Sequence, residues 1–158
     1  MTYLSLKTIH IISAFLLFGT GLGSAFYKWL ADRNGNIQHI AVTNKHVVLA
    51  DYLFTTPTII IQPLTGLWMA HLAQLPLTTP WIAISLGLYV FAGLCWLPVV
   101  YLQIRMQKMA EHAVRQQTEL PQQYGQYARI WFWLGVPAFV SIMLVITLMV
   151  YKHTGGLL

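Results

Sequence analysis

Four long apolar runs alternate with polar connections along the chain, over residues of about 4–29, 50–74, 80–104 and 129–152. In the first run, 20 uncharged residues lie between Lys7 and Lys28. A helix of that length spans roughly 30 Å, the thickness of the hydrocarbon core of a bilayer. The pattern predicts an all-α fold, a four-helix antiparallel transmembrane bundle that forms a single transmembrane domain over residues 1–158.

Small and polar residues recur at helical spacing on one face of three runs. The first run carries His10, Ser13, Gly21, Ser24 and Lys28; the second carries Asp51, Thr55, Thr58, Gln62, Thr65 and Met69; the third carries Ser85, Tyr89, Trp96 and Gln103. Lipid offers such side chains no hydrogen bonds, so these faces should point into the bundle. The predicted interior polar residues are Lys28, Asp51, Gln62, Tyr89, Trp96 and Gln103. The fourth run has only a weak stripe, marked by Pro137 and Ser141.

The connections predict how the runs are joined. Asn34-Gly35 is a turn signal, and the chain is polar from there to about residue 46. The short segment 74–80 should make the second and third runs antiparallel neighbours. Beyond Gln103 the pattern becomes amphipathic as far as His112, which indicates a helix that emerges along the membrane surface.

Composition supports a membrane protein, because only 8% of the residues are charged and 57% are hydrophobic, against about 25% charged in soluble domains. The predicted partner is the lipid bilayer and not nucleic acid, since the basic residues flank apolar runs. The single cysteine, Cys95, excludes an intramolecular disulfide and a cysteine metal cluster. A signal peptide ending near Ala25 is the alternative for the first run, but the apolar run continues to Trp29.

Two further patterns indicate contacts between helices. Gly19 and Gly23 form a GxxxG motif, which favours close helix packing. Lys28 and Asp51 fall at equal depth on neighbouring antiparallel helices, so we expect them to form an ion pair.

His10 is the candidate cofactor ligand, because it lies on an inward stripe within the apolar core. Its imidazole could ligate a haem iron or a copper ion, or it could be hydrogen-bonded to a neighbouring helix. The candidate second axial ligands at similar depth are Met69, His71 and Met149. On an ideal helix His71 lies opposite the polar face, so histidine/methionine and bis-histidine ligation both stay open.

The chain resembles a group of bacterial four-span integral membrane proteins of unknown function. The resemblance rests on segments 6–12, 56–58, 62–66 and 96–98 together with Gln103. That group is distantly similar to HemJ-type protoporphyrinogen oxidases, four-span haem b proteins, through Leu6-Lys7 before His10, through segment 64–68 and through Val136-Pro137. The similarity implies haem b as a cofactor and His10 as one of its ligands. The haem-binding histidine and lysine of the HemJ-type proteins have no counterpart at Tyr27-Lys28-Trp29 or at Ile84-Ser85.

Three functions follow as hypotheses. The first is a haem b redox protein of the bacterial cytoplasmic (inner) membrane that exchanges electrons with quinone. The second is a cofactor-free structural or assembly protein that binds a larger membrane protein complex through its small-residue faces. The third is a small-solute carrier, although four helices are few and no inverted repeat is visible.

The distribution of Lys and Arg predicts the orientation in the membrane. Seven of these residues lie in the first and third connections, whereas Lys7 and Lys152 lie on the other side. Basic residues concentrate on the cytoplasmic side, so both termini should lie outside the cytoplasm. A reporter that is active only in the cytoplasm, fused at Leu158, should therefore be inactive and should become active when fused at Gly35. The reverse result would contradict the predicted orientation.

Overall fold

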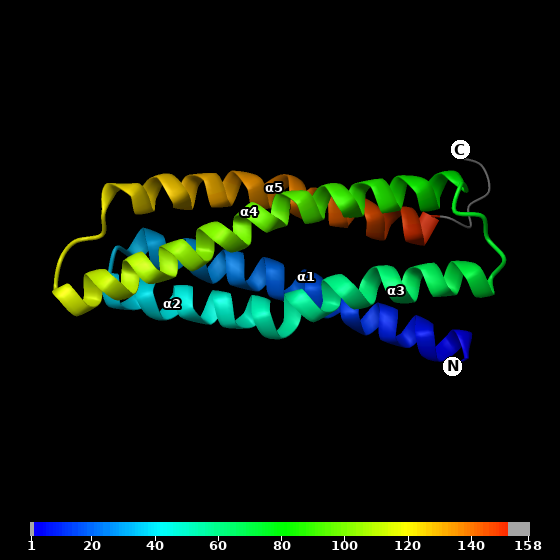
Figure 1. Cartoon of the computed structure of the whole chain (residues 1–158), viewed down its shortest axis with the longest axis horizontal. Helices are drawn as coiled ribbons and strands as arrows, with labels where there is room; N and C mark the ends of the chain where they lie inside the picture. The colour runs from blue at the N-terminus through cyan, green and yellow to red at the C-terminus, as the bar shows by residue number, and fades with distance from the viewer. Residues whose placement is uncertain (1, 152–158) are drawn as a thin grey trace.

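A computed structural model describes residues 2–151, and in these residues it is built from helices alone. The elements are α1 (Tyr3–Asn34), α2 (Ile37–Ala50), the π-helical turn η1 (Asp51–Thr55), α3 (Thr56–Leu72), α4 (Pro80–Gln116) and α5 (Gln122–Tyr151). Segments α2, η1 and α3 follow one another without a break, so the chain makes four long helical rods. Figure 1 shows these rods running antiparallel along one axis.

The prediction of an all-α four-helix membrane bundle is confirmed. Each of the four rods is long and apolar enough to cross a membrane. Apolar side chains such as Leu4, Phe15 and Leu94 cover much of the outer surface. The start of α1 and the turn between α3 and α4 share one end of the bundle, and the α1–α2 and α4–α5 connections share the other (Figure 1). We call the latter the hairpin end.

The helices are longer than the apolar runs. Helix α1 has 32 residues and α4 has 37, which corresponds to lengths of about 48 and 56 Å at 1.5 Å per residue. The helix that the sequence predicts beyond Gln103 is confirmed, since α4 continues to Gln116, and the polar segment 37–50 forms helix α2 (Figure 1). Both segments carry a small apolar stripe that packs within the bundle.

The turn at Asn34-Gly35 is confirmed. Gly35 ends α1 with φ of 73°, a left-handed conformation that glycine adopts without steric penalty. The Asn36 side chain then accepts a hydrogen bond from the His39 backbone N–H and caps the start of α2. This tight connection places α2 directly beside α1.

At the hairpin end the four rods share one apolar core. It is made of small and medium side chains with two aromatic rings: Ala31, Ile40, Ala41, Val99, Leu102, Met106, Ala110, Tyr124 and Trp131. Alanines at these positions let the helix backbones approach closely. The extensions beyond the apolar runs are therefore held together by ordinary core packing.

Away from the hairpin end the rods separate into two pairs. Helix α1 packs on α3, and α4 packs on α5, while α1 and α5 touch only briefly. Among the described residues α3 and α4 make no close backbone contact, although a short turn joins them. The second and third rods are antiparallel neighbours as predicted, but α2 makes the close backbone contact with α4, nearer the hairpin end, and α3 does not. Figure 1 shows the two pairs diverging.

A buried polar cluster lies within the core at the hairpin end. The Lys28 ammonium is fully buried and lies 2.9 Å from Asp32 Oδ2. Lys28 also donates to the Tyr124 hydroxyl at 3.0 Å, Asn44 donates to the same hydroxyl at 2.9 Å, and Tyr124 donates to Asp32 Oδ1 at 2.6 Å. We call Lys28, Asp32, Asn44 and Tyr124 the Lys28 cluster, and it joins α1, α2 and α5.

The predicted ion pair between Lys28 and Asp51 is therefore wrong. Asp32 lies one turn after Lys28 on the same helix, a spacing at which opposite charges meet. The Asp51 carboxylate instead accepts hydrogen bonds from Thr55 and Gln103. Asp32 lies beyond the first apolar run, which covers residues of about 4–29, so the pattern of inward stripes does not indicate it as a partner.

Replacing Asp32 should destabilise the fold strongly. In Asp32→Asn the Lys28 ammonium stays buried without a carboxylate, and breaking a buried ion pair in this way costs about 3–5 kcal/mol. Thermal unfolding of the protein in detergent, followed by circular dichroism, measures the effect. The exposed Lys45→Gln change provides the control and should leave the midpoint unchanged.

A double variant keeps this prediction testable if Asp32→Asn does not fold. Lys28→Met combined with Asp32→Asn removes both charges, so it should unfold at a higher temperature than Asp32→Asn alone. Equal midpoints for Asp32→Asn and Lys45→Gln would show that the ion pair contributes nothing.

Candidate functional site

A cavity of about 300 Å³ lies where the two helix pairs diverge, and we call it the central cavity. Residues of α1, η1, α3, α4 and α5 line it. The wall is mostly apolar and is rich in aromatic rings, namely Phe18, Tyr89, Trp96, Trp131, Phe132 and Phe139. Phe18 stacks on Phe139 with ring centroids 4.9 Å apart, which is one of the few contacts between α1 and α5.

Glycines create part of this space. Gly21, Gly93 and Gly135 line the central cavity from three different helices, and a Cβ atom added at any of them would meet no atom within 4 Å. The same holds for Gly19 and Gly23. The prediction that the GxxxG motif mediates close helix packing is therefore wrong for residues 2–151, because none of them packs closely against these glycines.

One end of the central cavity is polar. Thr55 donates to Asp51 Oδ1 at 2.7 Å and Gln103 Nε2 donates to Asp51 Oδ2 at 2.6 Å. The Trp131 indole N–H donates in turn to Gln103 Oε1 at 3.2 Å. These four residues, the Asp51 cluster, join η1, α4 and α5. Among the described residues Asp51 has no ion-pair partner, so hydrogen bonds alone satisfy its buried carboxyl group.

The π-helical turn places two members of this cluster. Its widened hydrogen bond joins the Thr56 N–H to the Asp51 carbonyl, five residues back. Asp51, Thr55 and Ile59 then all line the central cavity. Single π-turns within α-helices are uncommon and often lie at functional sites.

Pro63 determines which backbone carbonyl is open to a hydrogen bond from Tyr89. A proline has no N–H, so Pro63 leaves the carbonyl of Ile59, four residues earlier, without its helical donor. The Tyr89 hydroxyl donates to this carbonyl at 2.7 Å. This hydrogen bond bridges α3 and α4, whose backbones are not in close contact. In the same wall, the Trp96 indole N–H is buried and has no hydrogen-bond partner among the described residues.

The His10 side chain lies between its own helix, α1, and α3, and His10 is not among the residues that line the central cavity. It is 7% exposed. Its Nδ1 is 2.8 Å from Thr65 Oγ1, and Thr65 donates its own hydrogen to the Ile61 carbonyl at 2.7 Å. The histidine tautomer sets which of the two atoms, His10 Nδ1 or Thr65 Oγ1, donates in the bond between them.

Gln62 and Gly66 also lie beside His10. We call His10, Ser13, Gln62, Thr65 and Gly66 the His10 cluster. Gln62 Nε2 donates to the His10 carbonyl at 2.8 Å and to the Ser13 hydroxyl at 2.7 Å. A Cβ atom at Gly66 would lie 3.3 Å from His10 Cε1. Of the glycines discussed here, Gly66 is the one that permits a close approach of two helices.

The candidate ligands to haem lie in different surroundings. Met69 and Met149 are half-buried, and His71 is exposed. Within residues 2–151 no group of three or more His, Cys, Asp or Glu side chains is arranged to hold a metal ion. Of the predicted interior polar residues, Lys28, Asp51, Gln62 and Gln103 are buried, whereas Tyr89 and Trp96 are half-buried.

Sequence reasoning missed four members of these clusters. Asp32 could have been found from its spacing of four residues after Lys28. Asn44 and Tyr124 were assigned to connections, and only the helical continuation of α2 and α5 brings them into the core. Trp131 lies on the fourth run, whose inward face the pattern of polar residues did not identify.

Comparison with known proteins identifies the family. The family model described as "Predicted integral membrane protein (DUF2269)" matches residues 4–153, nearly the whole chain. No curated protein and no solved structure matches the chain. The chain belongs to the DUF2269 family of predicted integral membrane proteins.

Proposed function

We propose that this protein binds a lipid-soluble molecule of the quinone class in the central cavity. The observation that carries the proposal is the polarity of the cavity. Most of its hydrogen-bonding groups belong to the Asp51 cluster, and the rest of the wall is mainly aromatic and aliphatic apart from Ser24 and the polar atoms of Tyr89 and Trp96. Small-molecule sites usually have this composition, an apolar wall with a few polar groups that orient the ligand.

The size and position of the cavity favour a ligand that arrives through the lipid. A volume of about 300 Å³ lies at the lower end for small-molecule sites, so it suits a headgroup without its tail. Leu22 of α1 and Val140 of α5 line the cavity and are also exposed on the outer surface. Because α1 and α5 touch only briefly, a tail can leave between them into the bilayer.

The polar groups match both redox forms of such a headgroup. A quinone carbonyl accepts hydrogen bonds, and the unpartnered Trp96 indole N–H is a buried donor in the wall. A quinol hydroxyl donates hydrogen bonds, and the Asp51 carboxylate is an acceptor at the polar end. In the orientation that the basic residues favour, the Asp51 cluster lies toward the cytoplasmic side of the bacterial inner membrane, and both termini lie outside the cytoplasm.

Filling the cavity should abolish this binding. Titrating a short-tailed benzoquinone into the detergent-purified protein should quench tryptophan fluorescence saturably, since Trp96 and Trp131 line the cavity. Gly93→Leu should weaken binding at least about tenfold, or ~1.4 kcal/mol, because its side chain would occupy the open space. Leu94→Ala, at a neighbouring position that is 63% exposed, is the control and should bind normally.

Two outcomes would contradict the proposal. One is the absence of saturable quenching in the unaltered protein. The other is equal affinity for Gly93→Leu and Leu94→Ala, which would place any bound quinone outside the central cavity.

A second candidate function is haem b binding at His10. It is favoured by the hydrogen bond between His10 Nδ1 and Thr65 Oγ1, since histidines that bind metals usually have one ring nitrogen held in such a hydrogen bond. Met69 or Met149 would supply the second ligand from a half-buried position, and the exposed His71 suits that role less. Bound haem would supply one-electron redox chemistry.

His10→Ala should then remove or strongly shift the Soret band of protein purified from cells with ample haem. His39→Ala and His112→Ala are controls on exposed positions and should leave the band intact. A reduced-minus-oxidised spectrum separates histidine/methionine from bis-histidine ligation. A preparation without Soret absorbance would exclude this second candidate and would leave the quinone proposal untouched. Failure of both tests would favour the cofactor-free assembly function, with a membrane protein complex as partner.

A further inference from the structure

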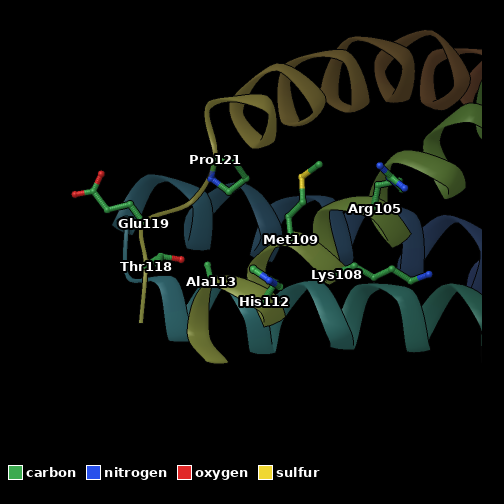
Figure 2. A pocket seen from close by; sticks show the side chains of 8 residues that line it. All are labelled: Arg105, Lys108, Met109, His112, Ala113, Thr118, Glu119 and Pro121. Carbon is green, nitrogen blue, oxygen red and sulfur yellow. The ribbon is translucent and has the colours of Figure 1, made fainter. Parts of the chain in front are cut away.

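A second cavity, of about 380 Å³, lies at the hairpin end beside the last turns of α4. We call it the α4 groove. Figure 2 shows the side chains that line it, with Arg105, Lys108 and His112 on α4 and Pro121 on the connection that leads to α5. It shares no lining residue with the central cavity, so it requires a separate explanation.

The basic residues of the α4 groove lie on one face of the helix. Arg105, Lys108 and His112 follow each other at spacings of three and four residues, and all three are exposed. Among the described residues neither Arg105 nor Lys108 has an ion-pair partner. Two acidic residues lie nearby. Glu111 accepts a hydrogen bond from Gln107, and Glu119 lines the far end of the groove and points outward (Figure 2).

This basic face continues the lipid-facing side of α4. Leu94, Leu97 and Tyr101 are exposed at the same helical spacing, and Arg105 is the next residue of this row. Arg105 lies 25 residues after Pro80, or roughly 37 Å along the helix. The hydrocarbon core is about 30 Å thick, and the headgroups extend the bilayer to about 40–45 Å. The row therefore changes from apolar to basic at the level of the headgroups.

We propose that Arg105, Lys108 and His112 bind the phosphate of an anionic phospholipid headgroup in the α4 groove. The guanidinium and ammonium groups recognise the phosphate oxygens by charge-assisted hydrogen bonds. The acyl chains of the same lipid lie along Leu97 and Tyr101, a contact that a soluble phosphate cannot make. The basic residues also place this end in the cytoplasmic leaflet, where anionic lipids attract juxtamembrane basic side chains.

The test measures how added lipid changes thermal stability in detergent. Mixed micelles of the full chain receive either phosphatidylglycerol or phosphatidylcholine, which carry the same phosphate but differ in net charge. Phosphatidylglycerol should raise the unfolding midpoint more than phosphatidylcholine does, and added salt should reduce the difference. Arg105→Gln combined with Lys108→Gln should abolish this preference. In a lipid titration, each lost charge should weaken binding about fivefold.

A matched control lies on the same helix. Arg115→Gln removes one exposed basic residue that does not line the groove, so it should keep the preference for phosphatidylglycerol. The midpoints in phosphatidylcholine show whether each variant is folded. Equal effects of the two lipids on the unaltered protein, or an equal loss in Arg115→Gln, would overturn the proposal. A midpoint shift with inorganic phosphate alone that is lost in the double variant would reject the lipid and assign the groove to a soluble phosphate.

Discussion

The hydrocarbon core of a bilayer offers no hydrogen bonds, and this constraint accounts for how the helices of this protein are joined. Polar side chains within the bundle must find partners on one another or on exposed carbonyl groups. They do so in three clusters. The His10 cluster joins α1 to α3, the Asp51 cluster joins η1 to α4 and α5, and the Lys28 cluster joins α1 to α2 and α5. Each connects helices that are distant in the sequence, so the clusters specify which helices meet and at which level.

The two halves of the bundle are held by different forces. At the hairpin end, alanines and Met106 form a tight apolar core around the Lys28 cluster. In the other half, burying leucine against leucine within a bilayer gives little advantage over contact with acyl chains. There the two helix pairs diverge and are bridged by single interactions, such as the hydrogen bond from Tyr89 to the Ile59 carbonyl. The central cavity lies where the tightly packed core of the hairpin end gives way to the two diverging helix pairs.

Much of this architecture could be predicted from the sequence, because helical periodicity in lipid is a strong signal. The uncharged runs gave the number and direction of the helices, and the polar stripe of the second run placed Asp51 and Gln62 on a face that is buried. The packing of the α2 and α4 extensions into the core could not be predicted, since their stripes of alanine and short polar residues resemble a solvent-exposed segment. The interaction partner of each buried polar side chain was harder still to predict. Equal depth suggested Asp51 for Lys28, but the rotation of each helix decides which side chains meet, and periodicity alone does not give that rotation. The GxxxG motif failed for a related reason, because it marks a surface that permits close approach and does not show that a second helix is present.

The location of Asp32 bears on how the protein is made. A membrane helix is synthesised and inserted in order, and when α1 first enters the bilayer none of the other helices exists. A lysine that depended on Asp51 would have to wait with an uncompensated charge until the second rod followed. Because Asp32 lies on the same helix, one turn after Lys28, the ion pair forms as soon as that turn becomes helical. The later arrival of Asn44 and Tyr124 then adds hydrogen bonds to a pair that is already neutral. The first helix thus neutralises its most polar side chain without help from the rest of the chain.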